Sequence, residues 1–437
     1  MTVALLLFAA MLVLMALRVP VWLAMALPGL AGVAWLASPE ALLAQLKGLT
    51  LARFTLYDLS VIPLFLLMGN LATQGGLSAA LFRAAAGWVG HWRGGLAQAA
   101  VISCAAFGAI CGSSVATAAT VGRVALPEMR RYGYEASFAT ATLAAGGTLG
   151  ILIPPSVVLV IYALVTEQNI ARLFAAAFVP GLLAAALYCG AVALAVRLRP
   201  ELGPPEPSVP WAVRWRLLAR VWPVAAIFAL VLGGIYGGVF TATEGAAVGT
   251  LATALVGALR GALTRAGLAQ ALVATAETTG LVFLIFLGAD ILNVALALSQ
   301  MPAQLAAWVG ALDAPPLLVL VALLLFYVLL GGVMDEIAML LLTLPVVFPA
   351  IMQLDLWGLA PEAKAIWFGI LLLTVVNIGL VAPPVGLNVW VVSTLAPDVP
   401  MRRTYARATI FLAADALRLA LLLAFPMLSL WLVQRMT

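Results

Sequence analysis

The chain has 437 residues, of which 65% are hydrophobic and only 9% are charged. Soluble domains carry about 25% charged residues, so this composition excludes a water-soluble protein and indicates a chain that crosses a membrane many times. The apolar stretches are continuous and do not alternate, which predicts α-helices and not the strands of a β-barrel. The net charge of +5 comes from basic residues between apolar stretches, where they orient a membrane protein. It gives no indication of nucleic-acid binding.

The first apolar segments, 1–17 and 20–37, predict two transmembrane spans. The first could pass for a secretory signal, but it has no basic N-terminal region and a second apolar run follows at once, so we interpret it as a retained span. The more polar residues 39–53 predict a helix along the membrane interface. A third span at 59–73 and an amphipathic arm at 77–93 follow.

Residues 94–129 are apolar but are interrupted in the middle by Gly112-Ser113-Ser114. Each half is too short to cross a bilayer, which needs about 20 residues. The pattern therefore predicts a re-entrant hairpin with its tip at the interruption. The next apolar segment, 134–165, contains Pro154-Pro155 and predicts a broken span. A last span at 173–196 and a proline-rich linker at 198–216 follow.

The same order of segments recurs in residues 217–437. After two spans, a polar arm at 260–277 and a third span, the apolar segment 315–352 is interrupted at 331–336 and predicts a second hairpin. The segment 364–395 contains Pro383-Pro384 and predicts a second broken span. We therefore expect an all-α polytopic membrane protein built from two repeats, 1–197 and 217–437.

Each repeat is expected to cross the membrane five times, because its hairpin enters and returns on one side. An odd number of crossings inverts the second repeat relative to the first, which is the architecture of many secondary transporters. With this assignment, 16 of the 22 Lys and Arg residues fall on one side and 5 on the other. Because basic loops stay in the cytoplasm, we expect the linker 198–216 to be cytoplasmic and both termini to lie outside.

The two breaks share one sequence motif: residues 150–155 and 379–384 both have the pattern Gly-x-x-x-Pro-Pro. Proline removes a backbone donor and disfavours helix in the residue before it, so each pair unwinds its span locally. Unpaired backbone groups are tolerated at membrane depth only where protein or a polar cavity satisfies them. One break alone could be an ordinary kink. Two breaks at matching places in two halves indicate a binding site near the membrane midplane.

These motifs resemble, in order, those of the large permease (M) subunit of TRAP transporters, tripartite ATP-independent uptake systems within the ion transporter superfamily. The matching residues are Gly94-Gly95-Leu96, Gly112 to Thr117, Pro127-Glu128-Met129, Gly133-Tyr134, Gly150 to Ser156, Phe240 to Glu244, Gly331 to Asp335, and Asn377 to Asn388. The second break departs from the family pattern, which is closer to Thr-Pro-Pro. Ala382 stands before Pro383 here, so one possible hydroxyl ligand is missing.

The resemblance implies an elevator-type carrier in the bacterial inner membrane that takes up an organic acid with sodium. In this family a periplasmic binding (P) protein delivers the substrate, often a C4-dicarboxylate or a sialic acid. The chain lacks the extra four-helix segment of fused permeases, which implies a separate small four-span (Q) subunit. We also expect the chain to contact membrane lipid on all sides.

The resemblance also implies Na⁺ between each hairpin tip and the break that faces it, with the substrate carboxylate between the two clusters. Unwound backbone offers carbonyl oxygens to a cation, and half-helix N-termini favour a carboxylate. The candidate sodium ligands are Gly112, Ser113, Thr148, Gly150, Pro154, Gly331, Asp335, Asn377, Gly379 and Pro383. The candidate substrate contacts are Ser113, Ser114, Thr117, Ser156, Asp335 and Asn388.

The other polar residues within apolar segments have simpler interpretations. Asp415 and Arg418 have i, i+3 spacing and are expected to pair, and Glu244 is expected to cap a helix. Asp290 is expected to face the interior without a role that we can name. The single histidine, His91, lies in an interfacial arm, and with no metal cluster, Ser-His pairing or nucleotide loop the sequence argues against an enzyme. The alternative transporter is a dicarboxylate or citrate symporter of the same superfamily that works without a binding protein.

Overall fold

The structure is a computed structural model, and it describes residues 2–311 and 314–436. All regular elements in these residues are helical, as the composition predicts. The helices of the first half are α1 (Thr2–Ala16), α2 (Val21–Leu36), α3 (Pro39–Phe54), η1 (Tyr57–Ser60), α4 (Val61–Gln74), α5 (Leu77–Val89), α6 (Gly95–Cys111), α7 (Ser114–Arg131), α8 (Ala136–Leu152), α9 (Val157–Thr166) and α10 (Ile170–Leu198).

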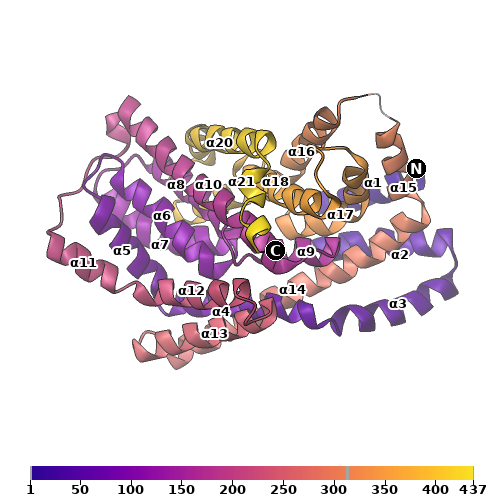
Figure 1. Ribbon diagram of the computed structural model, residues 1–437, viewed down its shortest axis with the longest axis horizontal. Helices are drawn as coiled ribbons and strands as arrows, with labels where there is room; N and C mark the ends of the chain where they lie inside the picture. The colour runs from indigo at the N-terminus through magenta and orange to yellow at the C-terminus, as the bar shows by residue number, and fades with distance from the viewer. Residues whose placement is uncertain (1, 312–313, 437) are drawn as a thin grey trace.

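The short helix η2 (Pro200–Leu202) lies in the connection between the halves. The helices of the second half are α11 (Trp211–Ala219), α12 (Trp222–Tyr236), α13 (Ala242–Leu259), α14 (Arg265–Leu298), α15 (Met301–Gly310), α16 (Pro316–Gly331), α17 (Glu336–Gln353), α18 (Pro361–Val381), α19 (Leu387–Leu395), α20 (Met401–Ala424), α21 (Met427–Leu430) and η3 (Val433–Arg435). Figure 1 shows α3, α4, α12, α13 and α14 along the lower edge of the molecule, below α6 to α10 and α16 to α20.

Two helical hairpins lie at the interruptions that the sequence predicts. In the first hairpin only Gly112 and Ser113 separate α6 from α7, and in the second hairpin residues 332–335 separate α16 from α17. The two helices of each hairpin contact one another. Gly112 has a φ of +65°, a conformation that glycine adopts without steric cost. Ser113 then starts α7 by accepting a hydrogen bond from the Ala116 amide at 3.4 Å.

Two helices are interrupted at the Pro-Pro pairs. The first break, residues 153–156, separates α8 from α9, which are bent by 43° to one another. The second break, residues 382–386, separates α18 from α19. Ser156 starts α9 in the same way that Ser113 starts α7, since its hydroxyl accepts from the Leu159 amide at 3.3 Å. Proline explains each interruption, because it cannot donate to the helical hydrogen-bond ladder.

Two boundaries differ from the sequence-based expectation. The polar arm at 260–277 is not separate from the span after it, because α14 begins at Arg265 and continues for 34 residues through both. The polar residues there are mainly good helix formers and contain no proline, so polarity marks an exposed surface and not an end of the helix. The linker expected at 198–216 is not wholly irregular either, because α11 begins at Trp211 and crosses its predicted end.

The contacts between helices repeat when the two halves are exchanged. The first helix of each hairpin packs on the first part of the broken helix of its own half, α6 on α8 and α16 on α18. The second helix of each hairpin packs on the short helix after the other half's break, α7 on α19 and α17 on α9. Outside this core, α2 packs on α14 as α13 packs on α4. The two halves are therefore interlocked around the hairpins, and the orientation of each in a membrane stays a prediction.

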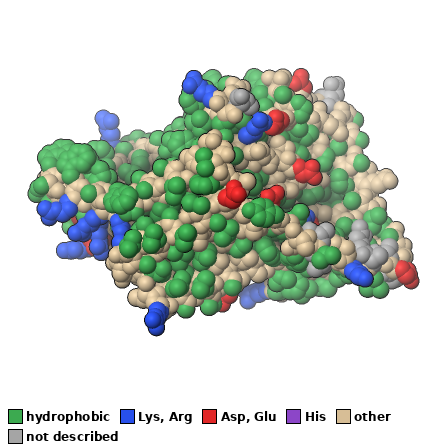
Figure 2. Space-filling model, turned by 60° about the horizontal axis from the view of Figure 1, so that its bottom comes forward, with side chains coloured by type: hydrophobic (Ala, Val, Ile, Leu, Met, Phe, Trp, Pro, Cys, Tyr) green, Lys and Arg blue, Asp and Glu red, His purple; other side chains and the backbone are tan. Residues whose placement is uncertain are grey.

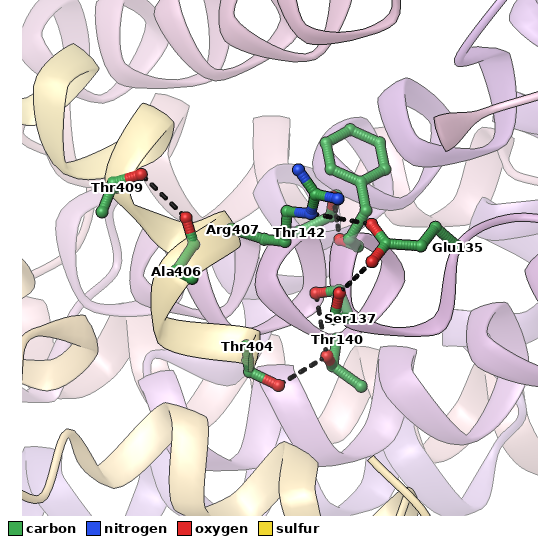
Figure 3. Close-up of polar contacts among 9 residues, drawn as sticks. Glu135, Ser137, Thr140, Thr142, Thr404, Ala406, Arg407 and Thr409 are labelled. Atoms are coloured by element: carbon green, nitrogen blue, oxygen red, sulfur yellow. Dashed lines mark hydrogen bonds and ion pairs between the residues drawn. The ribbon is translucent and has the colours of Figure 1, made fainter. Parts of the chain in front are cut away.

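Polar contacts join α8 to α20 near the start of α8 (Figure 3). Glu135 forms an ion pair with Arg407 at 2.8 Å and also accepts a hydrogen bond from the Ser137 hydroxyl. One turn further along α8, the hydroxyls of Thr140 and Thr404 lie 2.9 Å apart and are buried. These contacts hold the last long helix of the second half against the broken helix of the first.

Within residues 2–311 and 314–436, five helices are long and apolar enough to cross a membrane, and this number rises to eight if each strongly bent pair counts as one span. The five crossings expected in each half include α1 and α2, which have 15 and 16 residues and are shorter than a perpendicular crossing needs. Figure 2 shows hydrophobic side chains over much of the surface, with Lys and Arg mostly toward its edges. This surface fits a surrounding of lipid.

Candidate cation and substrate site at the hairpin tips

The tip of the first hairpin lies directly against the first break. A Cβ atom on Gly112 would stand 3.1 Å from the Pro155 carbonyl oxygen. On α8, a Cβ atom on Gly150 would stand 2.5 Å from the Thr117 hydroxyl oxygen and 2.6 Å from the Ser113 carbonyl oxygen. Only a glycine at 150 allows α8 to pass this close to the tip. As a result, the Ser113 carbonyl, the Thr117 hydroxyl and the Pro155 carbonyl bring their oxygen atoms close to the contact between the tip and the break.

The tip of the second hairpin meets the second break in the corresponding way. A Cβ atom on Gly379 would stand 2.7 Å from the Cα atom of Gly331. The Val385 amide, within the break, donates a hydrogen bond to the Gly332 carbonyl at 3.0 Å. Asp335 caps α17 by accepting hydrogen bonds from the amides of Ile337 and Ala338 at 3.0 and 3.3 Å. Its carboxylate is therefore engaged within its own helix.

Several buried polar atoms near the breaks have no hydrogen-bond partner among the described residues. Asn377, on α18 two residues before Gly379, is fully buried, and neither of its amide atoms has a partner. Asn388, on α19, donates to the Ala144 carbonyl at 3.1 Å, but its Oδ1 has no partner. The Thr117 hydroxyl is also buried without one. Because buried polar groups are normally paired, these atoms indicate a place where something else binds.

The two hairpins touch through a pair of side chains that the sequence analysis did not combine. The Ser114 hydroxyl, at the start of α7, donates to Oε1 of Glu336, at the start of α17, at 3.2 Å. Ser114 is fully buried and Glu336 is 6% exposed. The family motif ends at Asp335, and Glu336 is the next residue, so the motif did not include it. The signal that could have found it is its place at a predicted hairpin tip, where an acid is costly.

Other predicted site residues lie in or near the breaks but are engaged locally. The Ser156 hydroxyl donates to the Ile151 carbonyl at 2.5 Å and caps α9. The Thr148 hydroxyl donates to the Ala145 carbonyl and lies 3.1 Å from the Tyr188 hydroxyl, so its side chain faces α10 and away from the tip. Pro154 and its neighbours are buried, whereas Pro383, Pro384 and Val385 are exposed. The two breaks therefore differ in their surroundings.

Thr148 belongs to a buried polar cluster behind the first break. The Tyr188 hydroxyl on α10 donates to Asp415 on α20 at 2.7 Å. Asp415 Oδ1 lies 2.9 Å from Arg418 Nη2, which is close enough for an ion pair although the two are not aligned for a hydrogen bond. Asp415 and Arg418 are 1% and 0% exposed. The pairing predicted from their spacing is confirmed. Glu244 also caps α13 as predicted, in a reciprocal capping box with Thr241.

Comparison with known proteins identifies the family. The family model described as "Tripartite ATP-independent periplasmic transporter, DctM component" matches residues 8–428. The chain belongs to this family. It is therefore a member of a transporter permease family and not of an enzyme class, and the resemblance seen in the motifs is confirmed.

Relatives of this DctM-family permease include proteins named for different solutes. The C4-dicarboxylate TRAP transporter large permease protein DctM of Pseudomonas aeruginosa is 34% identical over 377 residues, which are 86% of each chain. The sialic acid TRAP transporter large permease protein SiaM of Vibrio cholerae is 29% identical over 375 residues, again 86% of each chain.

Among solved structures, the fold is similar to that of the YdaH transporter of Alcanivorax borkumensis. The TM-score is 0.61 at 19% identity, and the match covers 89% of this chain and 88% of the other. At this identity the likeness concerns the fold alone.

Proposed function

We propose that this permease carries out sodium-coupled uptake of a carboxylate-bearing solute across the bacterial inner membrane. A periplasmic binding protein delivers the solute, and a separate small four-span subunit completes the permease. The observation that carries the proposal is the pair of hairpin tips, each seated on a helix break through a glycine, at Gly150 and at Gly379. Family membership supports the partnership with a small permease and a binding protein.

The chemistry of the tips fits a hard cation. Carbonyl, hydroxyl and amide oxygens are the ligands that hard cations take in proteins. The Ser113 carbonyl and the Thr117 hydroxyl lie together against Gly150, and Asn377 offers an unpartnered amide oxygen on the other side. Each sodium ion that moves inward gains about 2.3 kcal/mol per 100 mV of membrane potential, so two ions can drive steep accumulation. The N-termini of α7 and α19 can favour a carboxylate between the tips.

An open cleft supports movement of the hairpins against the outer helices, as an elevator mechanism requires. It has a volume of about 880 Å³ and lies between α14 on one side and α9 and α17 on the other. On one wall, Arg53 of α3 forms an ion pair with Asp290 of α14 at 2.5 Å. Asn293 of α14 donates a hydrogen bond to the Leu341 carbonyl of α17 at 3.2 Å within this cleft, so a displacement of α17 would break that single bond and leave the ion pair of Arg53 and Asp290 intact.

Transport in proteoliposomes tests the proposal. The permease, its small subunit and its binding protein are reconstituted with the solute that copurifies with the binding protein. Uptake is expected only with an inward sodium gradient and with the binding protein present. Equal uptake under a potassium gradient would remove the sodium coupling, and full uptake without the binding protein would favour the symporter alternative.

A further inference from the structure

Glu336 is a buried acid without a countercharge among the described residues. Its Oε1 accepts a hydrogen bond from Ser114, and its Oε2 has no hydrogen-bond partner. The side chain takes part in none of the ion pairs formed by residues 2–311 and 314–436. A second acid, Asp335, precedes it directly, and the positive end of the α17 helix dipole is the nearest compensation.

A buried carboxylate is stable when it is paired with a cation or fully hydrogen-bonded. One neutral hydroxyl donor does not meet this requirement. Asp335 already uses the first amides of α17, since its Oδ1 accepts from Ile337 and Ala338. The free oxygen of Glu336 therefore needs either a proton or a cation from outside the chain, and a bound cation would compete with the proton for this oxygen.

The first hairpin supplies one hydroxyl next to Glu336, from Ser114, and a second hydroxyl nearby on α7 that lies against Gly150, from Thr117. Ser114 and Thr117 are one helical turn apart on α7 and share a face of that helix. Both are fully buried, and the Thr117 hydroxyl has no partner among the described residues. A carboxylate with neighbouring hydroxyls is a donor set for a hard cation. A single free carboxylate oxygen suits a monovalent ion better than a divalent ion, which usually takes several carboxylates.

We propose that Glu336 is the charged ligand of an alkali-cation position between the two hairpin tips, with the Ser114 hydroxyl as its second ligand. This position differs from the two tip-and-break positions, because its ligands come from the two hairpins and not from a hairpin and a break. The proposal rests on the proposed sodium coupling and deepens it. Binding there would hold the two halves together at their tips to a degree that rises with the sodium concentration until the position is filled.

The test measures cation binding by the purified permease, with its small subunit, in detergent and without substrate. Thermal unfolding is followed in NaCl, KCl and choline chloride at constant ionic strength, because a ligand that binds the folded state raises its stability. Glu336→Gln keeps the size and an acceptor for Ser114 but removes the charge. We expect the sodium concentration at which stabilisation sets in to rise at least about tenfold, which corresponds to one decade in Kd. At high sodium, the slope of stability against the logarithm of sodium concentration should fall by the equivalent of one bound ion.

Glu362→Gln is the matched control, because Glu362 is an acid at the start of α18 whose side chain is 58% exposed and paired with Arg172. It should titrate like the wild type. If Glu336→Gln also titrates like the wild type, the cation position is overturned while the proposed function stands. If the wild type itself is stabilised equally by sodium and potassium, the sodium coupling of the proposed function fails and this position fails with it.

A second variant covers the case in which Glu336→Gln does not fold. Glu336→Asp keeps the charge and withdraws it by one methylene group, so sodium should bind more weakly than in the wild type while stability in choline is retained. Unchanged sodium affinity in Glu336→Asp would contradict the proposal.

Discussion

Gly150 and Thr117 lie so close that a single methyl group at Gly150 would stand 2.5 Å from the Thr117 hydroxyl oxygen. The same relationship holds across the other half, where Gly379 lies against the backbone of Gly331. In both halves the broken helix approaches the hairpin at the glycine of the Gly-x-x-x-Pro-Pro motif. The glycine of the motif is therefore as important to the site as its prolines.

Gly150→Ala is expected to abolish transport and to lower the free energy of unfolding by about 1–3 kcal/mol, the usual cost of overpacking a buried contact. Gly190→Ala is the matched control, because a Cβ atom there meets nothing within 4 Å and α10 is helical at this position. Alanine is favoured over glycine in a helix by about 1 kcal/mol, so the control should be neutral or slightly stabilised. Uptake assays and thermal unfolding of both variants measure the difference. Normal transport by Gly150→Ala would show that the close approach is not needed.

Pro154→Ala is expected to let the helix close across the first break and so to withdraw carbonyl oxygens from the tip. Losing one ligand worth about 1–2 kcal/mol corresponds to roughly 5- to 30-fold weaker sodium affinity. The paired variant Ser113→Ala with Ser114→Ala is expected to abolish transport without loss of assembly. A sodium titration of uptake compares Pro154→Ala with Thr409→Ala, whose hydroxyl donates to the Ala406 carbonyl of its own helix. Uptake at high sodium tests the double serine variant against the same control. If both variants behave like the control, the breaks are ordinary kinks.

Asp415 and Arg418 are expected to contribute to the free energy of unfolding because each compensates the buried charge of the other. Removing one partner, as in Asp415→Asn, leaves a buried guanidinium uncompensated and should cost about 3–5 kcal/mol. Replacing both, as in Asp415→Asn with Arg418→Met, should restore most of that loss, because an apolar replacement of a buried pair is often neutral. Thermal unfolding of the single and double variants measures the coupling. Equal losses that add up in the double variant would mean that the two residues act independently.

The orientation of the chain can be tested with single cysteines. Ser208 is exposed in the connection between the halves, which the charge distribution predicts to be cytoplasmic. Asp58 is exposed in the short helix η1, which is predicted to lie outside. In intact cells an impermeant thiol reagent should label Asp58→Cys readily and Ser208→Cys only after the cells are opened. The reverse pattern would overturn the predicted orientation. The native cysteines Cys104 and Cys111 are buried, and Cys189 is replaced by Ala in the background.

Features with a local cause could be predicted from the sequence. The Pro-Pro pairs predicted the positions of the two breaks. The spacing of three residues predicted the pairing of Asp415 with Arg418, and a capping pattern predicted the role of Glu244. Contacts between distant residues could not be predicted in the same way. Ser114 and Glu336 are 222 positions apart, and Arg53 and Asp290 are 237 apart. No local pattern selects one partner among the many polar residues of the other half, because packing of whole helices decides which of them meet.

The direction in which a side chain points could not be predicted from the sequence either. Thr148 stands two residues before Gly150, but a helix turns by 100° per residue, and its hydroxyl faces Tyr188 instead of the hairpin tip. The boundaries of α14 were missed for a related reason. Polar residues at 260–277 suggested a separate arm, whereas the helix continues through them with one exposed face.

The difference in exposure between the two breaks has a consequence for the whole chain. Helix contacts repeat when the halves are exchanged, yet the first break is buried and the second is open to the surface. If the two halves exchanged their conformations, the same pairs of helix types would remain in contact. Pro154 would then be exposed and Pro383 would be buried. We therefore expect a second conformation in which each half adopts the conformation that the other half has here. The present difference in exposure between the two breaks would then distinguish one of these two states from the other.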